Sequence, residues 1–167
     1  MINGIDYLKQ MYPNCNEDDY QPSGLDLRVG RVFKFDDNLI ASLHEGEKQL
    51  PKQIEIPIGN LPEYALYDGW LLAPHRPYMF EVQEKIKIGD NNAQFYLPRS
   101  SLLRAGVNVY TALGDLGYNG FLRFLVINHR GAPFFIQQGE RFAQLVDFEV
   151  RGGSESYNGD YQEDEKP

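Results

Sequence analysis

The sequence contains a single cysteine, Cys15, and no cysteine or histidine pattern at metal-ligand spacing. An internal disulfide and a structural zinc site are therefore excluded, and we expect Cys15 to be an ordinary exposed thiol. Basic residues are also few, because 16 lysines and arginines stand against 24 acids and give a formal net charge of −8. Such a charge disfavours nucleic-acid polymers and anionic membranes as partners. A small polyphosphate can still bind, since a few arginines and a divalent cation overcome the global charge locally.

Long apolar runs are missing as well. No stretch reaches the roughly 18 apolar residues that a membrane-spanning helix needs, and the first residues lack the apolar core of a signal peptide. We therefore expect a cytoplasmic protein. Hydrophobic residues nevertheless make up 42% and aromatic residues 13% of the 167 positions, which indicates a folded chain. The length fits one domain over residues 1–150, followed by a flexible tail over 151–167 that is polar and rich in glycine and acids.

Apolar spacing predicts one N-terminal helix and many strands. The spacing between Ile2 and Met11 is helical and predicts a short helix over 3–11 that ends before Pro13. The charged segment 44–51 predicts a loop. Alternating or continuously apolar segments predict strands, some with their turns, at 25–32, 33–43, 53–58, 69–74, 78–88, 121–128, 134–136 and 142–150. This pattern is typical of an all-β sandwich or barrel, and it places Asp26 on the solvated face of its strand.

The densest group of polar side chains with a chemical use follows the apolar run that ends at Pro98. Arg99, Ser100 and Ser101 place a guanidinium beside two hydroxyls, and Arg104 lies about one helical turn beyond Ser100. Arginine forks, hydroxyls and free backbone amides at a helix start are the donors that phosphate oxygens accept. The tripeptide alone also fits the N-terminus of a helix on a solvated turn.

A loop punctuated by glycines follows about a dozen residues later, from Gly114 to Gly120, and carries Asp115 and Tyr118. A phosphate-binding cluster followed by a carboxylate on a tight loop suggests hydrolysis of a phosphate ester. Structural explanations compete with this interpretation. Asp115 could stabilise the turn through an Asx-type hydrogen bond, and Tyr118 could be a core aromatic residue.

Five segments, in this order, resemble the motifs of the dUTPase and dCTP deaminase superfamily. The segments are QPSGLDLR at 21–28, PRSSLLRAG at 98–106, DLGYNG at 115–120, GERFAQL at 139–145 and YNGDYQ at 157–162. The resemblance implies an all-β, distorted jelly-roll subunit of the dUTPase-like β-clip type with one or two short helices. It also implies a homotrimer with active sites at subunit interfaces, and a nucleoside triphosphate ligand with Mg²⁺.

The resemblance also implies roles for individual residues. Asp115 corresponds to the aspartate that deprotonates the attacking water, and Tyr118 to the aromatic residue that packs on the deoxyribose. Asp26 corresponds to a position that contacts Mg²⁺ through water, and the hairpin 107–113 to the segment that reads the pyrimidine. Positions that correspond to other substrate contacts are Arg99, Ser100, Ser101, Arg104 and Gln144, and in the tail, which would close over the site, Tyr157, Tyr161 and Gln162.

Leu125 favours hydrolysis over deamination. In the deaminases a glutamate occupies the corresponding position of the strand, and here residues 121–128 contain no acid. Deamination needs a group that shuttles a proton between the water and the leaving amine, which leucine cannot supply. The sequence therefore predicts a dUTP diphosphatase that releases dUMP and pyrophosphate. Two alternatives remain: a dCTP deaminase or bifunctional deaminase and hydrolase that uses an acid from elsewhere, and a nucleotide-binding trimer without activity. A monomeric β-sandwich also fits the apolar periodicity.

Overall fold

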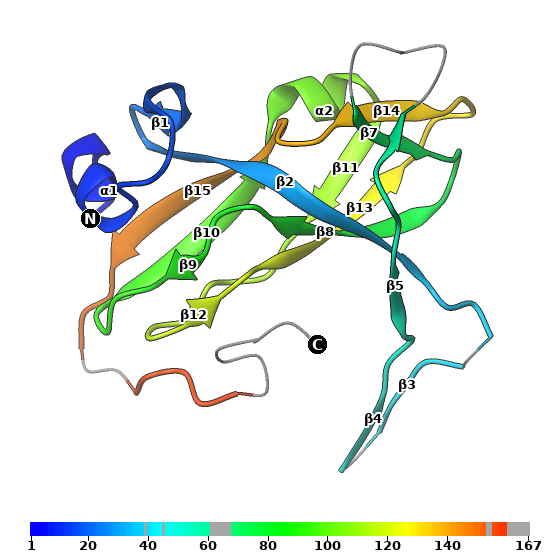
Figure 1. Cartoon of the computed structure of the whole chain (residues 1–167). Helices are drawn as coiled ribbons and strands as arrows, with labels where there is room; N and C mark the ends of the chain where they lie inside the picture. The colour runs from blue at the N-terminus through cyan, green and yellow to red at the C-terminus, as the bar shows by residue number, and fades with distance from the viewer. Residues whose placement is uncertain (39, 45, 61–67, 153–154, 160–167) are drawn as a thin grey trace.

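The structure is a computed structural model that describes residues 1–167 except 39, 45, 61–67, 153–154 and 160–167. It consists mainly of short strands, as the sequence predicts (Figure 1). The two α-helices are α1 (Ile5–Met11) and α2 (Ser100–Arg104), and a 3-10 turn, η1, spans Glu17–Asp19. Helix α1 falls within the predicted range and ends before Pro13, and it buries Leu8. No helix in the described ranges is long and apolar enough to cross a membrane.

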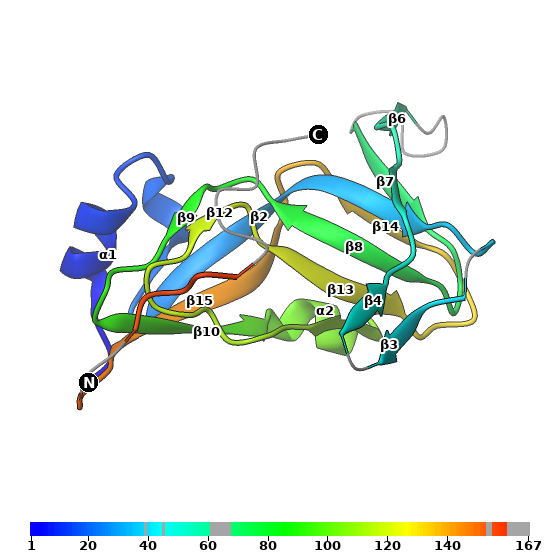
Figure 2. The ribbon, with the colours of Figure 1, turned by 90° about the horizontal axis from the view of Figure 1, so that it is seen from below.

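The main sheet has eight strands and is built around β2 (Gly24–Phe35). Its path runs β10 (Asn92–Pro98), β15 (Arg141–Glu149), β2, β8 (Pro77–Val82), β13 (Arg123–Asn128) and β11 (Val107–Tyr110), and all of these pairs are antiparallel. Two further strands, β1 (Tyr20–Gln21) and β5 (Gln53–Glu55), also pair with β2. Figure 2 shows the long strands of this sheet side by side. Strand β2 therefore links nearly every part of the fold.

The first and last strands of this path approach each other and nearly close the sheet into a barrel. The hydroxyl of Thr111, just after β11, donates to the carbonyl of Tyr96 in β10 at 2.8 Å. Three residues later, Gly114 forms an antiparallel bridge with Gln94 of β10. We call this line of contact, between residues 94–96 and 111–114, the seam. The loop that carries Asp115 therefore begins at the seam.

The remaining strands form small sheets at the ends of the main sheet. Strand β7 (Asp68–Leu72) pairs with β6 (Gly59–Asn60) and β14 (Phe134–Gln137), and β9 (Ile86–Lys87) pairs with β12 (Asn119–Gly120). Strands β3 (Ser42–His44) and β4 (Glu47–Gln49) form a hairpin that projects from the body in Figure 1. The prediction of a loop over 44–51 was therefore wrong, because a positive φ of 80° at Gly46 lets the chain reverse.

The interior is mainly apolar, and one of the acids buried in it, Asp26, was placed in solvent by the strand pattern. Leu25, Leu27, Phe80 and Phe142 are fully buried. Asp26 lies between the two leucines but is only 2% exposed, so its predicted place on a solvated face was wrong. Alternation along a strand assigns a side chain to one face of the sheet, but it does not show that side chains from distant strands also cover that face. The expectation of an all-β fold with one or two short helices is confirmed.

Candidate active site

Asp115 lies on a turn that is fixed to the sheet at the seam. Gly114 exchanges two backbone hydrogen bonds with Gln94, at 2.8 and 3.0 Å. The N–H of Tyr118 donates to the carbonyl of Asp115 at 3.2 Å, and Gly117 adopts a φ of 76°, which glycine tolerates best. The side chain of Asp115 is exposed. The chain therefore presents a carboxylate to solvent from a turn whose base is held in place.

Residues 107–113, which were expected to read the pyrimidine, do not form a hairpin. Residues 107–110 form β11, which pairs with β13, and residues 111–113 then continue beside β10 as an exposed stretch without regular structure. The prediction of a hairpin over 107–113 was therefore wrong. The exposed residues 111–113 nevertheless lead directly to Gly114 and Asp115.

Tyr118 and part of the tail pack against each other beside Asp115. Tyr118 is 8% exposed, and its ring meets that of Tyr157 edge-on at a centroid distance of 5.9 Å. The N–H of Tyr157 donates to the carbonyl of Leu116 at 2.7 Å, and the Ser156 hydroxyl donates to Asp90 at 3.2 Å. Tyr157 is thus brought to the loop that carries Asp115. Tyr161 and Gln162 lie outside the described residues.

Helix α2 presents the predicted phosphate-binding residues. Arg99 is the extended residue that precedes the helix, and its N–H donates to the carbonyl of Phe142 in β15 at 3.1 Å. Ser100, Ser101 and Arg104 are exposed, while Leu102 of the same helix is buried in the core. The predicted helical turn is confirmed. Its apolar anchor turns the hydroxyls and the Arg104 guanidinium outward, where an anion can reach them.

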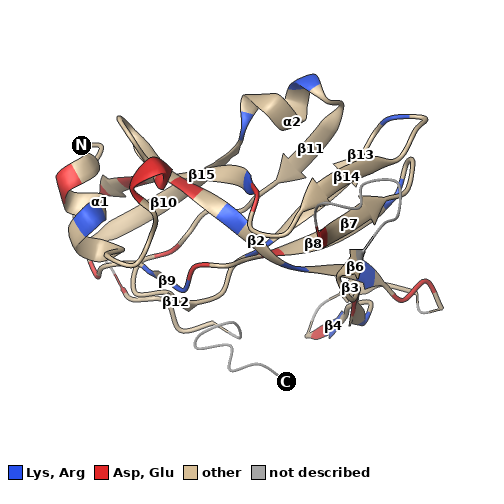
Figure 3. Ribbon diagram, turned by 45° about the horizontal axis from the view of Figure 1, so that its top comes forward, with Lys and Arg blue, Asp and Glu red and all other residues tan. Residues whose placement is uncertain are grey.

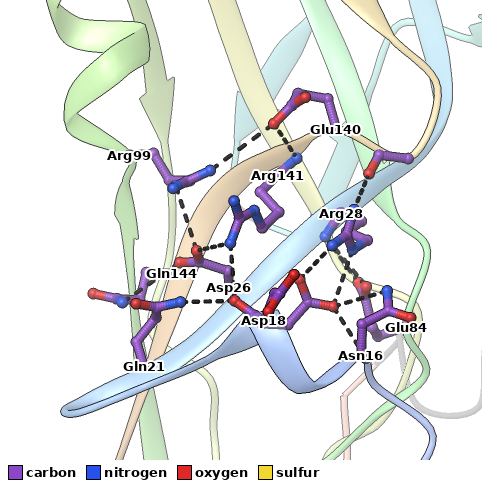
Figure 4. Close-up of polar contacts among 12 residues, drawn as sticks. Asn16, Asp18, Gln21, Asp26, Arg28, Glu84, Arg99, Glu140, Arg141 and Gln144 are labelled. Carbon is purple, nitrogen blue, oxygen red and sulfur yellow. Dashed lines mark hydrogen bonds and ion pairs between the residues drawn. The ribbon is translucent and has the colours of Figure 1, made fainter.

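A buried carboxylate joins three of the sequence motifs. Asp26 Oδ2 lies 3.4 Å from Nε of Arg99 and 3.5 Å from Nη1 of Arg141, and Oδ1 accepts from Gln144 at 3.5 Å (Figure 4). Burial raises the pKa of Asp26 above its ordinary value, and the charges of Arg99 and Arg141 offset part of that rise. Oδ2 has ion-pair distances to both guanidinium groups but no hydrogen bond. Arg141 also donates to the carbonyl of Asp18 at 2.9 Å, so the Asp26 group is tied to the turn at η1 as well.

Arg28 braces the strand that carries Asp26, and the strand pattern gave no sign of this role. Its guanidinium forms a bidentate pair with buried Asp19, at 2.6 and 3.0 Å, and donates to the carbonyl of Gly139 at 2.8 Å. The side chain of Glu84 accepts the backbone N–H of Arg28 at 3.1 and 3.3 Å. Figure 3 shows this concentration of charge, with basic residues on α2, β2 and β15 and acids in η1. These contacts hold the turn before Arg141 in place.

The single chain assembles two groups of site residues and keeps them apart. One group combines Asp26, Arg99 and Gln144, and the other combines Asp115 with Tyr118 and Tyr157. Arg99 follows Gln94, the seam partner of the Asp115 turn, by five residues along β10. At about 3.3 Å per residue this corresponds to about 17 Å, too far for one small phosphate group to touch both.

Other features of the described chain are less suited to catalysis. A cavity of about 440 Å³ between β2, β5, β7 and β8 includes neither Asp115 nor Arg99. Cys15 is partly buried rather than exposed, and burial raises the pKa of its thiol to about 11, which argues against a nucleophile. Among the described residues, no three His, Cys, Asp or Glu side chains gather as a metal site.

A comparison with models of protein families shows to which family the chain belongs. The profile of the dCTP deaminase-like family matches residues 6–150, which include the Asp26 group and Asp115. The chain belongs to this family. The profile covers the first four of the five predicted motifs, and the tail segment 157–162 lies beyond the matched range.

Curated relatives resemble this dCTP deaminase-like chain over nearly its whole length. A protein of Methanopyrus kandleri named probable deoxyuridine 5'-triphosphate nucleotidohydrolase is 40% identical, covering 96% of this chain and 99% of its own. The deoxyuridine 5'-triphosphate nucleotidohydrolase of Methanocaldococcus jannaschii is 35% identical, covering 97% and 99%. In structure, the chain resembles the 2'-deoxycytidine 5'-triphosphate deaminase of Agrobacterium tumefaciens, with a TM-score of 0.64 at 18% identity over 87% of this chain and 47% of that one. The structural likeness supports the fold.

Proposed function

We propose that the chain hydrolyses dUTP to dUMP and pyrophosphate. The observation that carries the proposal is an exposed Asp115 on a fixed turn, next to a sheet whose β13 strand, RFLVIN, contains no acid. Leu125 of that strand pairs with Met79, and Glu81, the acid of β8, is engaged by the guanidinium groups of Arg31 and Arg123. Hydrolysis needs one base at the water, whereas deamination also needs a shuttle to the leaving amine. The names of the archaeal relatives support the same choice.

In the proposed mechanism, Asp115 accepts a proton from a water molecule that attacks the α-phosphorus in line, and pyrophosphate leaves from the opposite side. The arginine forks and hydroxyls of α2 and the Gln144 amide bind the phosphate oxygens and stabilise the charge that develops on them. Tyr118 supplies an apolar surface for the deoxyribose.

Mg²⁺ is the proposed cofactor. The described residues form no set of three carboxylates or histidines, so the donor set fits an ion whose oxygens come mainly from the triphosphate. Asp26 is the proposed contact to the ion, through a water molecule, because its Oδ2 accepts no hydrogen bond from the described residues. Bound with the nucleotide, the ion would neutralise charge on the phosphates. We expect Mg²⁺ to bind weakly to the free protein and well in the presence of nucleotide.

We further propose a homotrimer in which the Asp26 group of one chain meets the Asp115 group of another. The separation of about 17 Å along β10 supports such an arrangement, because no single phosphate group reaches both groups of residues. Exposed apolar side chains near both groups offer a surface for the contact; they are Phe95, Leu97, Leu103, Tyr110 and Leu113. The tail over 151–167 would cover the bound nucleotide, with Tyr157, Tyr161 and Gln162 as its contacts.

Subunit complementation tests the shared site. Asp115→Asn and Arg99→Ala should each be inactive alone, because each removes one half of the site. Mixed assemblies from co-expression should regain dUTP hydrolysis, since some interfaces then combine an intact Asp115 with an intact Arg99. Failure of the mixture to recover activity, with trimers present by light scattering, would show that both groups act within one chain or that the assignment is wrong.

Product analysis tests the reaction itself. The purified protein with Mg²⁺ should release pyrophosphate and dUMP from dUTP, and no ammonia from dCTP. Asp115→Asn should lower turnover at least about a hundredfold while nucleotide binding persists. Ammonia from dCTP would favour the deaminase or bifunctional alternative despite Leu125. Nucleotide binding without any product would favour a binding trimer.

A further inference from the structure

A buried chain of hydrogen bonds runs beneath the Asp115 turn. The hydroxyl of Tyr96 donates to Oε1 of Gln94 at 2.8 Å. The amide of Gln94 donates in turn to the Tyr12 hydroxyl and to Asp147, both at 2.8 Å. Gln94 is 0%, Asp147 2%, Tyr96 3% and Tyr12 6% exposed. Buried polar groups are costly unless they are paired, so this network fixes its members in one arrangement.

The network reaches the main chain of the seam from below. Gln94, which orients the Tyr96 hydroxyl through its side chain, also binds both backbone groups of Gly114. A Cβ atom at position 114 would overlap the Tyr96 hydroxyl and lie 2.7 Å from Cδ1 of Ile88. Real Cβ atoms essentially never approach another atom that closely, so only glycine fits here. The Tyr96 hydroxyl therefore forms the floor on which the peptide before Asp115 rests.

This floor is rigid on the side of Tyr96 and yields on the side of Ile88. The Tyr96 ring packs against Phe124 at a centroid distance of 5.0 Å, and its hydroxyl has one fixed hydrogen-bond acceptor. Cδ1 of Ile88 is the free end of a side chain that can change rotamer. Tyr96 is therefore the part of the floor that determines how far the turn stands from β10.

We propose that Tyr96 is a positioning residue for Asp115. Its hydroxyl, held by Gln94, sets the position of the Gly114 peptide at the seam. In this way it places the Asp115 carboxylate within hydrogen-bond reach of the attacking water. This inference rests on the proposed function, because it assigns Tyr96 a part in the reaction of Asp115. A displacement of about 1 Å at a reacting group can cost about a hundredfold in rate, so small changes in this floor should be visible in turnover.

The test combines single variants with a double variant. Tyr96→Phe removes the hydroxyl and should lower kcat about tenfold, and Gly114→Ala should lower kcat about a hundredfold because the turn is pushed away from β10. In both variants kcat should change by a larger factor than KM for dUTP, since the phosphate contacts at Arg99 lie about 17 Å along the strand. The double variant Tyr96→Phe/Gly114→Ala should exceed Gly114→Ala in kcat, because the new methyl group then occupies the space of the lost hydroxyl.

Two controls separate this role from general stability. Tyr78→Phe removes the hydroxyl of another buried tyrosine, which does not lie at the seam and which accepts the backbone N–H of Ala73 at a distance of 2.8 Å. This variant should leave kcat unchanged. Ile88→Val combined with Gly114→Ala removes only the yielding contact and should not restore kcat. Restoration by Ile88→Val rather than by Tyr96→Phe would overturn the proposal, as would additive effects in the double variant.

Independent readouts keep the outcomes distinguishable. If Tyr96→Phe does not fold, Gly114→Ala alone decides, because a wild-type kcat in that variant contradicts a role for the floor. If the wild-type protein hydrolyses no dUTP, the proposed function fails. The contact between positions 96 and 114 is then still measured by thermal unfolding of the four proteins of the cycle, where additive changes in stability would refute it.

Discussion

Glu84 is a partly buried glutamate whose ionisation should be measurable in the stability of the protein. It follows β8, and its carboxylate oxygens accept the backbone N–H of Arg28 at 3.1 and 3.3 Å. Burial raises its pKa from the ordinary 4.5 to about 7. Hydrogen bonds from the Arg28 and Glu84 backbone and the charge of Arg28 lower the pKa, whereas the charge of Asp19 raises it. In the folded protein this group therefore changes charge near neutral pH.

The direction of the effect follows from where the proton binds more tightly. The folded chain holds the Glu84 proton better than the unfolded chain does, so the group's contribution to stability is fully present below pH 4.5 and is lost as pH rises through about 7. One pKa unit corresponds to about 1.4 kcal/mol, which gives an upper limit of about 3 kcal/mol for the loss. Partial solvation of the carboxyl group makes about 1–3 kcal/mol the expected range.

Glu84→Gln isolates this contribution, because glutamine keeps an oxygen for the Arg28 N–H but cannot ionise. At about pH 8 the variant should be more stable than wild type by about 1–3 kcal/mol, and at about pH 4 the two should match. Urea unfolding at one fixed protein concentration measures the difference, since subunit association also affects stability. Glu155→Gln, at an exposed position, is the control and should leave wild-type behaviour at both pH values. The reasoning would be refuted by a variant that is less stable than wild type at about pH 8. It would also be refuted by a variant whose free energy of unfolding differs from that of wild type by the same amount at both pH values.

Three further changes test the packing of the core, the proposed phosphate-binding residues and the close approach of strands. Phe142→Ala empties a fully buried site between aromatic rings at 5.4 and 6.0 Å and should cost about 3–5 kcal/mol in urea unfolding. Arg99→Lys keeps the charge but loses the fork, so KM for dUTP should rise about tenfold in steady-state assays, with a smaller change in kcat. Gly24→Ala would press a Cβ into the carbonyl of Leu145 and should lower Tm, whereas Gly4→Ala, with no atom within 4 Å, should not; equal Tm values would contradict the packing.

Local sequence patterns predicted the features that depend on neighbouring residues. Helix α1 follows from apolar spacing within one turn, and α2 follows from a polar start that precedes buried Leu102. The turn at Asp115 follows from its flanking glycines, of which Gly117 has the positive φ that glycine favours. In each case the decisive interactions join residues a few positions apart, so the sequence alone was sufficient.

The features that the sequence missed depend on distant contacts. Asp26 is buried because Arg99 and Gln144 cover it from β10 and β15, and Gln144 lies 118 residues away. The partner of Arg28 is Asp19 in the preceding turn, but its second contact, the carbonyl of Gly139, comes from the other end of the domain. Arg141 of β15 adds a second guanidinium to Asp26, at 3.5 Å from Oδ2.

The central place of β2 has a consequence for the order of folding during synthesis. Its edge at Asp26 pairs with β15 at Gln144, which the ribosome adds 118 residues later. Until β15 emerges, the backbone donors and acceptors along this part of β2 lack that partner, and such open edges recruit other chains. Pairing over so long a separation also slows folding, because the intervening loop must be closed before the strand contacts form. A nascent chain of this protein is therefore most exposed to misassembly just before its final strand arrives.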